Sequence, residues 1–489
     1  MTGECEMKKS LLLKPSIAII FILLFVAVTP GQDKSAASGR PLEGIWQGAL
    51  DAGSIKLRLV LKISKAQDGS FAATFDSIDQ GASGIPVSSI IYKDRSVSFE
   101  LKSAGGSYEG TMSEDGSEIT GRWKQGGAVL PLTFRRDEKV PETRRPQEPK
   151  KPYPYNEEDV VYDNPDAGIK LAGTLTTPRT EGPFPAALLI TGSGPQNRDE
   201  ALLGHRPFLI LADYLTRRGI AVLRVDDRGV GKSTGNFNKA TSEDFASDVL
   251  AGLEFLKSRK DIDSRRIGLV GHSEGGLIAP MVAAKSRDVA FIVLMAGPGI
   301  TGEEILYLQG ALIARANGAN DETIAKRRAS QEHLFTVMKE EKDLASAEKR
   351  LREEAAARMS QLTEEEKKAR GTSEDTLDSN LQRVLTPWFR YFLTYDPRPA
   401  LMKVKCPVFA INGEKDLQVP AKENLLAIAQ ALEDGGNSDY AVMKLPSLNH
   451  LFQTCQTGSP DEYAAIEETM SPITLETIAD WIEARTSKP

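Results

Sequence analysis

Apolar and polar residues alternate with a period of two in a series of short segments near the start of the chain. Such alternation is typical of β-strands that have one buried and one exposed face. Turn-forming pairs such as Asp68-Gly69 and Asp115-Gly116 separate the segments. The pattern predicts a small all-β domain over residues 41–136, either a barrel or a sandwich, with strands at 55–63, 70–75, 88–92, 97–101, 107–112, 118–123 and 129–134.

From about residue 158 onward, short apolar runs alternate with longer segments of helical character. Strands are expected at 186–191, 221–225, 267–270, 291–295, 408–411 and 441–445, and helices at 206–218, 242–259, 275–286, 420–432 and 472–486. Apolar strands separated by helices indicate a mainly parallel sheet that is covered on both faces. A hairpin at 158–177 adds antiparallel strands at one edge. The pattern therefore predicts an α/β domain over residues 158–489.

This alternation stops between Pro298 and Pro407, where the sequence is helical and rich in charge. Residues 339–369 have the dense Glu, Lys and Arg content of solvated helix faces. The ends of the insertion are apolar, and the second end, 384–393, is rich in aromatic residues that need a surface to pack on. We therefore expect a helical cap over the carboxyl edge of the sheet at about 300–396. The alternative is a surface excursion unrelated to the active site.

The two predicted domains are joined by residues 137–157, in which five prolines lie among charged residues. A segment of this composition is predicted to be a semi-rigid, solvated linker.

The first residues of the chain have the features of an export signal. Lys8 and Lys9 precede an unbroken apolar run at 17–28, and small and polar residues follow it. The run suits the core of a signal peptide and is too short for a membrane-spanning helix. We expect residues 1–32 to be a signal peptide and the protein to be exported to the periplasm or the medium, without stable membrane insertion. An uncleaved anchor is the alternative.

Charge and residue counts argue against several functions. The net charge is −7 and the chain has no basic cluster, so a nucleic-acid partner is not expected. The four histidines and three cysteines lack the spacing of a metal site, and no cofactor is expected. Gly231-Lys232-Ser233 resembles the end of a phosphate-binding loop, but Asp226 stands where that motif requires glycine. Cys406 and Cys455 either pair or are free thiols.

The segment Gly271-His272-Ser273-Glu274-Gly275 follows a predicted strand and precedes a predicted helix. A serine at a sharp strand-to-helix turn needs small neighbours, because its backbone is strained and other chain segments approach closely. The five-residue pattern is weak by itself. Its position between strand and helix makes Ser273 the candidate nucleophile.

A serine hydroxyl is a poor nucleophile until a base takes its proton. Of the four histidines, only His450 lies in a loop after a predicted strand and before the last helix, where it can reach the carboxyl edge of the sheet. Asp416, in the loop after strand 408–411, is the candidate that orients this imidazole. Glu414, in the same loop, is the alternative.

With these motifs, residues from about 158 to 486 resemble the α/β-hydrolase superfamily, especially its bacterial esterases and serine aminopeptidase-like enzymes. The segment that begins Thr191-Gly192-Ser193-Gly194 stands where that family has its glycine-rich oxyanion loop, and residues 226–233 match its D-x-R-G-x-G-x-S turn. The resemblance implies that the backbone N–H groups of Ser193 and Glu274 bind the oxyanion, with Gly194 as the alternative to Ser193.

The resemblance also implies a serine hydrolase that forms an acyl-enzyme on Ser273, and together with the expected signal peptide it gives an exported serine hydrolase. Esters are the expected substrates because alcohols leave more readily than amines, so the specific prediction is a carboxylesterase for small or medium acyl esters. One alternative is an aminopeptidase, in which Glu274, Glu303 and Glu304 would bind the substrate ammonium. A thioesterase and a binding protein with a vestigial hydrolase domain are the others.

Overall fold

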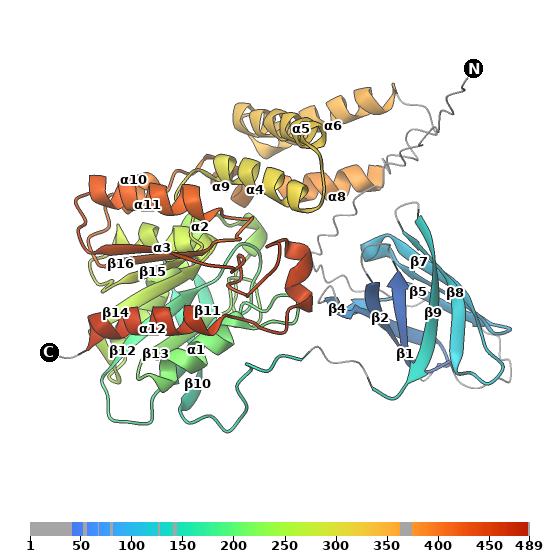
Figure 1. Ribbon diagram of the computed structural model, residues 1–489, viewed down its shortest axis with the longest axis horizontal. Helices are drawn as coiled ribbons and strands as arrows, with labels where there is room; N and C mark the ends of the chain where they lie inside the picture. The colour runs from blue at the N-terminus through green and yellow to red at the C-terminus, as the bar shows by residue number, and fades with distance from the viewer. Residues whose placement is uncertain are drawn as a thin grey trace, which may run out of the picture.

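The computed structural model describes residues 42–487, apart from 52–55, 67, 79–81, 126–127, 140–143 and 362–373. The predicted signal peptide, residues 1–32, therefore lies outside the described residues. The described part of the chain forms an all-β domain and an α/β domain (Figure 1). Its helices include none that is both long enough and apolar enough to cross a membrane.

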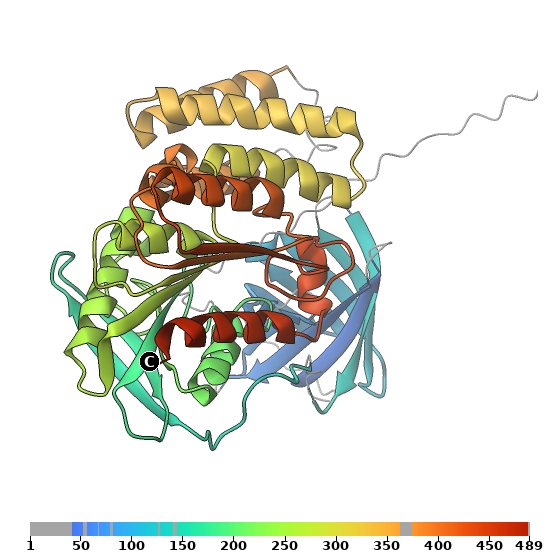
Figure 2. The ribbon, with the colours of Figure 1, turned by 60° about the vertical axis from the view of Figure 1, so that its left-hand side comes forward.

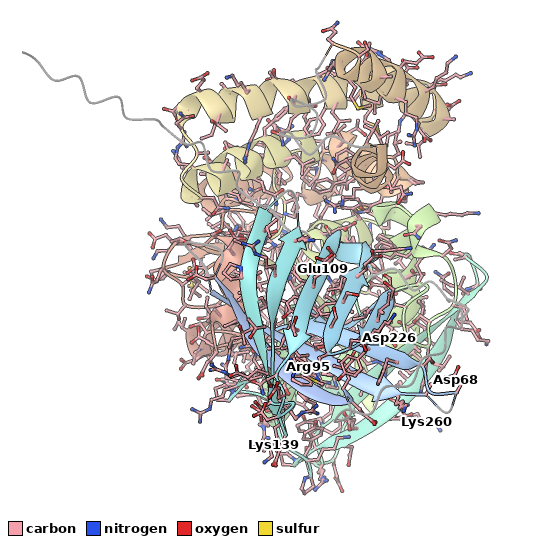
Figure 3. The ribbon with its side chains drawn as sticks, turned by 90° about the vertical axis from the view of Figure 1, so that its right-hand side faces the viewer. Asp68, Arg95, Glu109, Lys139, Asp226 and Lys260 are labelled. Atoms are coloured by element: carbon pink, nitrogen blue, oxygen red, sulfur yellow. The ribbon has the colours of Figure 1, made fainter. Side chains whose placement is uncertain are left out.

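The β domain consists of one antiparallel sheet of nine strands in the order β4-β3-β2-β1-β9-β8-β7-β6-β5. A single curved sheet corresponds to a half-barrel and not to a sandwich of two sheets (Figure 3). Its strands are β1 (Gly44–Asp51), β2 (Lys56–Lys65), β3 (Phe71–Ser77), β4 (Ala82–Pro86), β5 (Ser89–Lys93), β6 (Ser96–Leu101), β7 (Gly106–Met112), β8 (Glu118–Gln125) and β9 (Ala128–Asp137).

Strands β1 and β4 are the two that the alternation pattern missed. In β1, Gly48 interrupts the apolar series. A Cβ at this position would lie 2.9 Å from both the Leu132 side chain and the Thr133 carbonyl oxygen, so the glycine permits β1 to lie close against β9. Strand β4 is only five residues long and ends in Pro86, which makes it hard to distinguish from a turn.

The β domain has its own hydrophobic core, made largely of aromatic side chains. The rings of Phe99 and Tyr108 stack with their centroids 5.2 Å apart, and those of Phe75 and Trp123 stack at 5.5 Å. Trp46 is fully buried and donates its indole N–H to the Leu42 carbonyl oxygen. These rings fill the inside of the half-barrel, as expected for a domain of this size.

The second domain is built on an eight-stranded sheet in the order β10-β11-β13-β12-β14-β15-β16-β17. The strands from β12 to β17 are parallel to one another, whereas β10 and β11 form an antiparallel hairpin at one edge and β11 pairs antiparallel with β13. Their bounds are β10 (Asn156–Asn164), β11 (Ile169–Thr177), β12 (Phe184–Ile190), β13 (Ala221–Val225), β14 (Ile262–His272), β15 (Ile292–Met295), β16 (Val408–Gly413) and β17 (Tyr440–Leu445). The predicted hairpin and parallel sheet are confirmed.

Helices cover both faces of this sheet (Figure 2). Helices α1 (Pro207–Arg217) and α12 (Pro472–Thr486) pack on one face, and α2 (Ser242–Ser258), α3 (Glu274–Ala283) and α11 (Ala421–Asp434) pack on the other. The two hydrophobic cores lie between these layers. This strand order and layering are those of the α/β-hydrolase fold that the sequence motifs implied.

The insertion between β15 and β16 is helical, as expected, and lies above the sheet in Figure 1. It contains α4 (Gly302–Ala316), α5 (Asp321–Glu340), α6 (Leu344–Met359), α8 (Glu374–Val384) and α9 (Pro387–Thr394), followed by the short α10 (Arg398–Leu401). A small core that includes Phe335, Met338 and Phe389 holds these helices together. Helix α9 also contacts α2, which connects the cap to the sheet domain.

The described part of the linker is attached to the α/β domain, although we expected a solvated segment. Arg145 and Gln147 donate hydrogen bonds to backbone carbonyl groups of that domain.

Candidate active site

Ser273 lies at a sharp turn between β14 and α3. Its φ of 53° and ψ of −117° place a non-glycine residue in a strained region of backbone conformation. Its N–H donates to the Met295 carbonyl oxygen at 2.8 Å, which ties the turn to the adjacent strand. A Cβ on Gly271 would lie 2.0 Å from the Gly275 carbonyl oxygen, and one on Gly275 would lie 2.2 Å from that of Ile190. The glycines of the motif are therefore required by close backbone approaches.

His450 and Asp416 meet in two loops at the carboxyl ends of β17 and β16. His450 Nδ1 lies 2.8 Å from Asp416 Oδ2, and both side chains are buried. Asp416 Oδ1 accepts the backbone N–H groups of Gln418 and Val419 at 2.8 and 2.9 Å. Because the carboxylate faces Nδ1, that nitrogen carries the proton in the neutral ring and Nε2 keeps a lone pair.

Glu414, the alternative partner for His450, lies in the same loop as Asp416 but contacts other residues. Its carboxylate forms an ion pair with Lys444 at 3.3 Å and accepts the Ser447 N–H at 3.3 Å. Two of the other histidines also have separate roles. His205 binds the Thr469 hydroxyl and the Tyr463 carbonyl oxygen, and burial lowers its pKa to about 4. His333 contacts Glu354 within the cap.

A buried pair that the sequence did not reveal lies between the candidate residues. Glu200 Oε1 accepts the Gly192 N–H at 2.7 Å and lies 2.9 Å from His272 Nδ1, while His272 Nε2 lies 3.0 Å from the His450 carbonyl oxygen. Both ring nitrogens thus face acceptors, which favours the doubly protonated ring. Burial alone would lower the pKa of His272, but the charge and hydrogen bond of Glu200 outweigh it and the pKa is raised.

The predicted oxyanion loop passes directly beside the nucleophile. A Cβ on Gly192 would lie 3.2 Å from Ser273 Cβ, and Ser193 is the next residue in the loop. The Thr191 hydroxyl donates to Asp227 Oδ1 at 2.7 Å, and the Gln196 N–H donates to Asp227 Oδ2 at 2.8 Å. Asp227 therefore holds both ends of the loop.

The segment that resembles a phosphate-binding loop has a structural role. Asp226 binds Arg198 at 2.7 Å, and the Ser233 hydroxyl donates to the Asp226 carbonyl oxygen at 2.7 Å. Ser233 Oγ also accepts the Ala172 N–H at 2.9 Å. The turn is thereby closed on itself and braced against β11.

Glu274 connects the nucleophile helix to the cap. Its Oε1 accepts the Ser242 hydroxyl at 2.6 Å and the Trp388 indole N–H at 2.7 Å. The carboxyl group is buried, and burial raises its pKa. Trp388 belongs to α9, so this contact joins the cap to the residue that follows Ser273.

Glu303 and Glu304, the other two candidates for binding a substrate ammonium, have partners within the cap. Glu303 forms an ion pair with Lys339 at 2.7 Å and accepts the Tyr307 hydroxyl at 3.0 Å. Glu304 accepts both the N–H and the hydroxyl of Thr301 and so caps α4.

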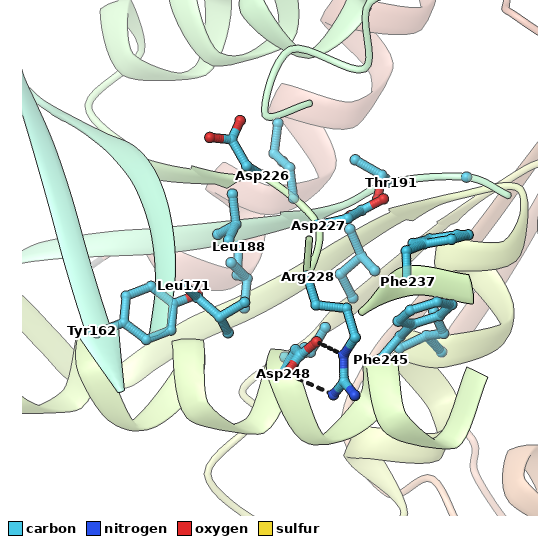
Figure 4. A pocket seen from close by; sticks show the side chains of 16 residues that line it. Tyr162, Leu171, Leu188, Thr191, Asp226, Asp227, Arg228, Phe237, Phe245 and Asp248 are labelled. Carbon is cyan, nitrogen blue, oxygen red and sulfur yellow. Dashed lines mark hydrogen bonds and ion pairs between the residues drawn. The ribbon is translucent and has the colours of Figure 1, made fainter. Parts of the chain in front are cut away.

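A cavity that is partly open to solvent begins at the oxyanion loop and extends between the sheet and α2 (Figure 4). Thr191 and Gly192 line the end near Ser273, and the ion pair of Arg228 with Asp248 lies along one side. Asp226 and Asp227 also line it, and the remaining lining is apolar or aromatic and is formed by Tyr162, Leu171, Leu188, Leu189, Ile190, Val225, Phe237, Phe245, Val249 and Ile278.

Within the described ranges there is no group of three or more His, Cys, Asp or Glu side chains arranged to hold a metal ion. Cys406 and Cys455 are both free thiols, so of the two alternatives the structure has the unpaired one.

Comparison with known proteins yields one family and several partial relatives. The sequence profile of the X-Pro dipeptidyl-peptidase (S15) family matches residues 167–445, which is more than half of the chain. Esterase EstD of Thermotoga maritima is 31% identical over 168 residues, which are 33% of this chain and 39% of that esterase. The putative hydrolase YtaP of Bacillus subtilis is 34% identical over 125 residues, which are 22% of this chain and 41% of YtaP. The chain therefore covers well under two thirds of either relative.

Solved structures give a more distant likeness. The α/β hydrolase GrgF from Penicillium has a TM-score of 0.43 at 17% identity, over 68% of this chain and 100% of its own. The Pyrococcus furiosus esterase Pf2001 has a TM-score of 0.40 at 17% identity, over 68% of this chain and 94% of its own.

Proposed function

The chain belongs to the X-Pro dipeptidyl-peptidase (S15) family, and we propose that it is a serine hydrolase that cleaves carboxylic esters through an acyl-enzyme on Ser273. The observation that carries this proposal is the 2.8 Å contact of His450 with Asp416, in loops at the same sheet edge as the strained Ser273 turn. A base held by a carboxylate at that edge is what a serine nucleophile requires.

In the proposed reaction, Asp416 accepts the Nδ1–H of His450 and orients the ring. The free Nε2 takes the proton of Ser273 Oγ as this oxygen attacks the ester carbonyl carbon. When the tetrahedral intermediate collapses, His450 returns the proton to the departing alcohol. Water then attacks the acyl-enzyme with the same base, which releases the acid and restores Ser273.

The developing oxyanion is proposed to bind the backbone N–H groups of Ser193 and Glu274. Glu274 begins α3, so its N–H points from a helix N-terminus and adds the favourable end of the helix dipole. Glu200 and Asp227 support this arrangement, because they fix Gly192 and the ends of the loop that carries Ser193.

Esters are favoured over amino-terminal peptides by the acidic residues near the site. A peptidase that acts on a free amino terminus needs a carboxylate for the substrate ammonium. Glu303 is neutralised by Lys339, Glu304 caps α4, and Glu274 is buried among neutral donors. These three carboxyl groups are therefore engaged within the protein.

The cavity behind the oxyanion loop supports small or medium acyl groups as the substrate class. Thr191 and Gly192 of the oxyanion loop line it, and most of the other lining residues are apolar, so an acyl chain that passes this loop would meet an apolar space.

A paired assay tests the proposal. Wild type and Ser273→Ala are compared on p-nitrophenyl acetate, butyrate and octanoate and on aminoacyl p-nitroanilides. We expect strong ester turnover in the wild type and a loss of at least about a thousand-fold in Ser273→Ala, with Ser286→Ala as the control that keeps activity. Faster cleavage of the anilides than of the esters would replace the esterase by a peptidase, and ester turnover that survives in Ser273→Ala would reject the nucleophile.

We also propose that the protein is exported. The support is the pair Lys8 and Lys9 followed by the apolar run at 17–28. Fractionation of the producing bacterium, with amino-terminal sequencing of the purified protein, tests this. A mature terminus near residue 33 is expected, whereas an intact terminus in the membrane fraction would indicate an anchor.

A further inference from the structure

Arg145, in the linker between the two domains, binds two separate segments of the α/β domain. Its Nε donates to the Gly204 carbonyl oxygen at 3.2 Å, and its Nη2 donates to that of Leu203 at 3.0 Å. On the other side, Nη1 donates to the Ile466 carbonyl oxygen at 2.8 Å and Nη2 to that of Ala464 at 3.0 Å. One guanidinium thus joins a loop near the start of this domain to one near its end.

Arg145 joins the two segments by hydrogen bonds to their carbonyl oxygens and not by a surface ion pair. A guanidinium holds five N–H donors in a rigid planar fork, so it can bind carbonyl groups in two directions at once. Arg145 is half-buried, and its burial lowers its pKa against the opposing charges of Glu148 and Glu467. A lysine has no fork of this shape and cannot reproduce the four contacts.

The first bound segment is a tight turn that carries Glu200 at its base. Leu202 and His205 exchange backbone hydrogen bonds, and Leu203 and Gly204 at the tip have φ angles of 53° and 77°. A leucine in this region is unfavourable by itself and needs outside support. Arg145 supplies that support by binding the carbonyl groups of both tip residues.

Glu200 connects this turn to the site through its hydrogen bonds. It contacts the Gly192 N–H in the oxyanion loop, and it contacts His272, which contacts the His450 carbonyl oxygen. The distance between the oxyanion loop and the base is therefore fixed through Glu200.

The second bound segment reaches the same base from the opposite direction. Ala464 and the neighbouring Tyr463 belong to the short helix η4 (Pro460–Ala465). The Tyr463 carbonyl oxygen contacts His205 at 2.9 Å, and Gln453 contacts both His205 and Asn449, the residue before His450. Arg145 thus connects two segments that each lead to His450.

We propose that Arg145 is a positioning residue for the hydrolase site. It joins the 203–204 turn to the 464–466 segment and thereby sets the position of the oxyanion loop relative to His450. This inference rests on the proposed function. It makes the linker, which lies outside the residues matched by the family profile, part of the structure that the reaction needs.

The test uses the full chain with four substitutions. Arg145→Ala removes all four contacts with the α/β domain, and Arg145→Lys keeps the positive charge but not the planar guanidinium. Gln147→Ala is the matched control, because Gln147 holds the same linker to residues 469–470 and does not contact the 203–204 turn. Arg144→Ala removes a neighbouring exposed arginine.

We expect kcat for p-nitrophenyl butyrate to fall about 10- to 100-fold in Arg145→Ala with little change in KM, because a small misplacement of reacting groups slows the chemical step. Arg145→Lys should be intermediate, and the two control variants should stay near wild type. Added guanidinium at low concentration should partly restore Arg145→Ala. Combining Arg145→Ala with Glu200→Gln should reduce kcat by less than the product of the two single effects, because both act along one path.

Circular dichroism establishes which variants are folded, and if Arg145→Ala is not folded the comparison rests on Arg145→Lys. Wild-type kcat in the folded variant would overturn the proposal, as would an equal loss in Gln147→Ala. The rate of labelling of Ser273 by a fluorophosphonate separates this inference from the proposed function. A wild-type protein that is not labelled refutes the hydrolase, whereas equal labelling of wild type and Arg145→Ala refutes only the positioning role.

Discussion

At the scale of single residues, carboxyl groups buried around Ser273 have different partners. Glu200 faces the ring of His272, whereas Asp227 accepts the Thr191 hydroxyl and the Gln196 N–H. Burial raises the pKa of Asp227 to about 8, and the charges of Glu274 and Glu200 act in the same direction. The folded protein therefore keeps Asp227 protonated at neutral pH.

This protonation predicts how stability depends on pH. In the unfolded chain Asp227 ionises near pH 4, so between about pH 4 and pH 8 the folded state holds a proton that the unfolded state has released. The stability that this group contributes therefore falls as the pH rises through that interval. Asp227→Asn removes the effect and leaves both contacts possible, since its oxygen can accept the Gln196 N–H and its amide can donate to the Thr191 hydroxyl, which then accepts instead of donating.

Thermal unfolding between pH 5 and pH 9 checks this prediction. The Tm of wild type should fall more steeply with rising pH than that of Asp227→Asn. The difference corresponds to a loss of about 1.4 kcal/mol of unfolding free energy for each pH unit inside the interval. Asp166→Asn, at an exposed site, should follow wild type. Parallel curves for wild type and Asp227→Asn would contradict a raised pKa.

At the scale of elements, helix α9 of the cap is linked to the nucleophile helix α3 by a hydrogen bond. Thr386 caps its N-terminus by accepting the Phe389 N–H, and Trp388 stacks on Phe392 with the ring centroids 5.3 Å apart. The Trp388 indole N–H donates to Glu274 in α3. The position of the cap is thus coupled to the start of α3 by one side chain.

Trp388→Phe tests this coupling, because it keeps an aromatic ring and removes the donor. Loss of a hydrogen bond to a buried carboxyl group costs about 1–3 kcal/mol, so we expect a lower Tm and a several-fold higher KM for p-nitrophenyl octanoate. Tyr391→Phe changes a polar group of the same helix and is expected to leave KM close to wild type. If both variants bind the ester as well as wild type, the Trp388 contact does not control access to the site.

At the scale of the whole molecule, the β domain and the α/β domain have separate hydrophobic cores. The core of the β domain centres on Trp46 and its aromatic neighbours, whereas Trp481 of α12 packs on Phe409 in the sheet of the other domain. Domains with independent cores are expected to unfold in separate steps.

Scanning calorimetry should therefore show two unfolding transitions, and Trp46→Ala should lower the midpoint temperature of the one that belongs to the β domain. Loss of a fully buried tryptophan costs about 3–5 kcal/mol, and esterase activity at room temperature should be retained because the linker contacts of Arg145 do not involve Trp46. Trp481→Ala should lower the midpoint temperature of the transition that belongs to the α/β domain, and it should also reduce esterase activity. A single transition that both variants shift together would show that the two domains unfold as one unit.

The sequence by itself determined the order and type of most elements. Period-two alternation and apolar runs between helices are local consequences of which face each residue buries, so strands such as β13 and helices such as α12 were predicted close to their observed bounds. Strand β1 was missed because the close approach of β9, which lies far away in the chain, requires a glycine at position 48. The candidate residues Ser273, Asp416 and His450 were likewise found from their positions after predicted strands.

Only the tertiary structure decided which side chains meet. Asp416 and Glu414 lie in one loop and look equivalent in the sequence, but the fold turns Asp416 toward His450 and Glu414 toward Lys444. No sequence motif marks Glu200, Trp388 or Arg145. Each of them contacts residues that lie far away in the chain, so no local pattern reveals its role. A local pattern records whether a residue is buried, whereas the identity of its partner depends on how distant segments pack together.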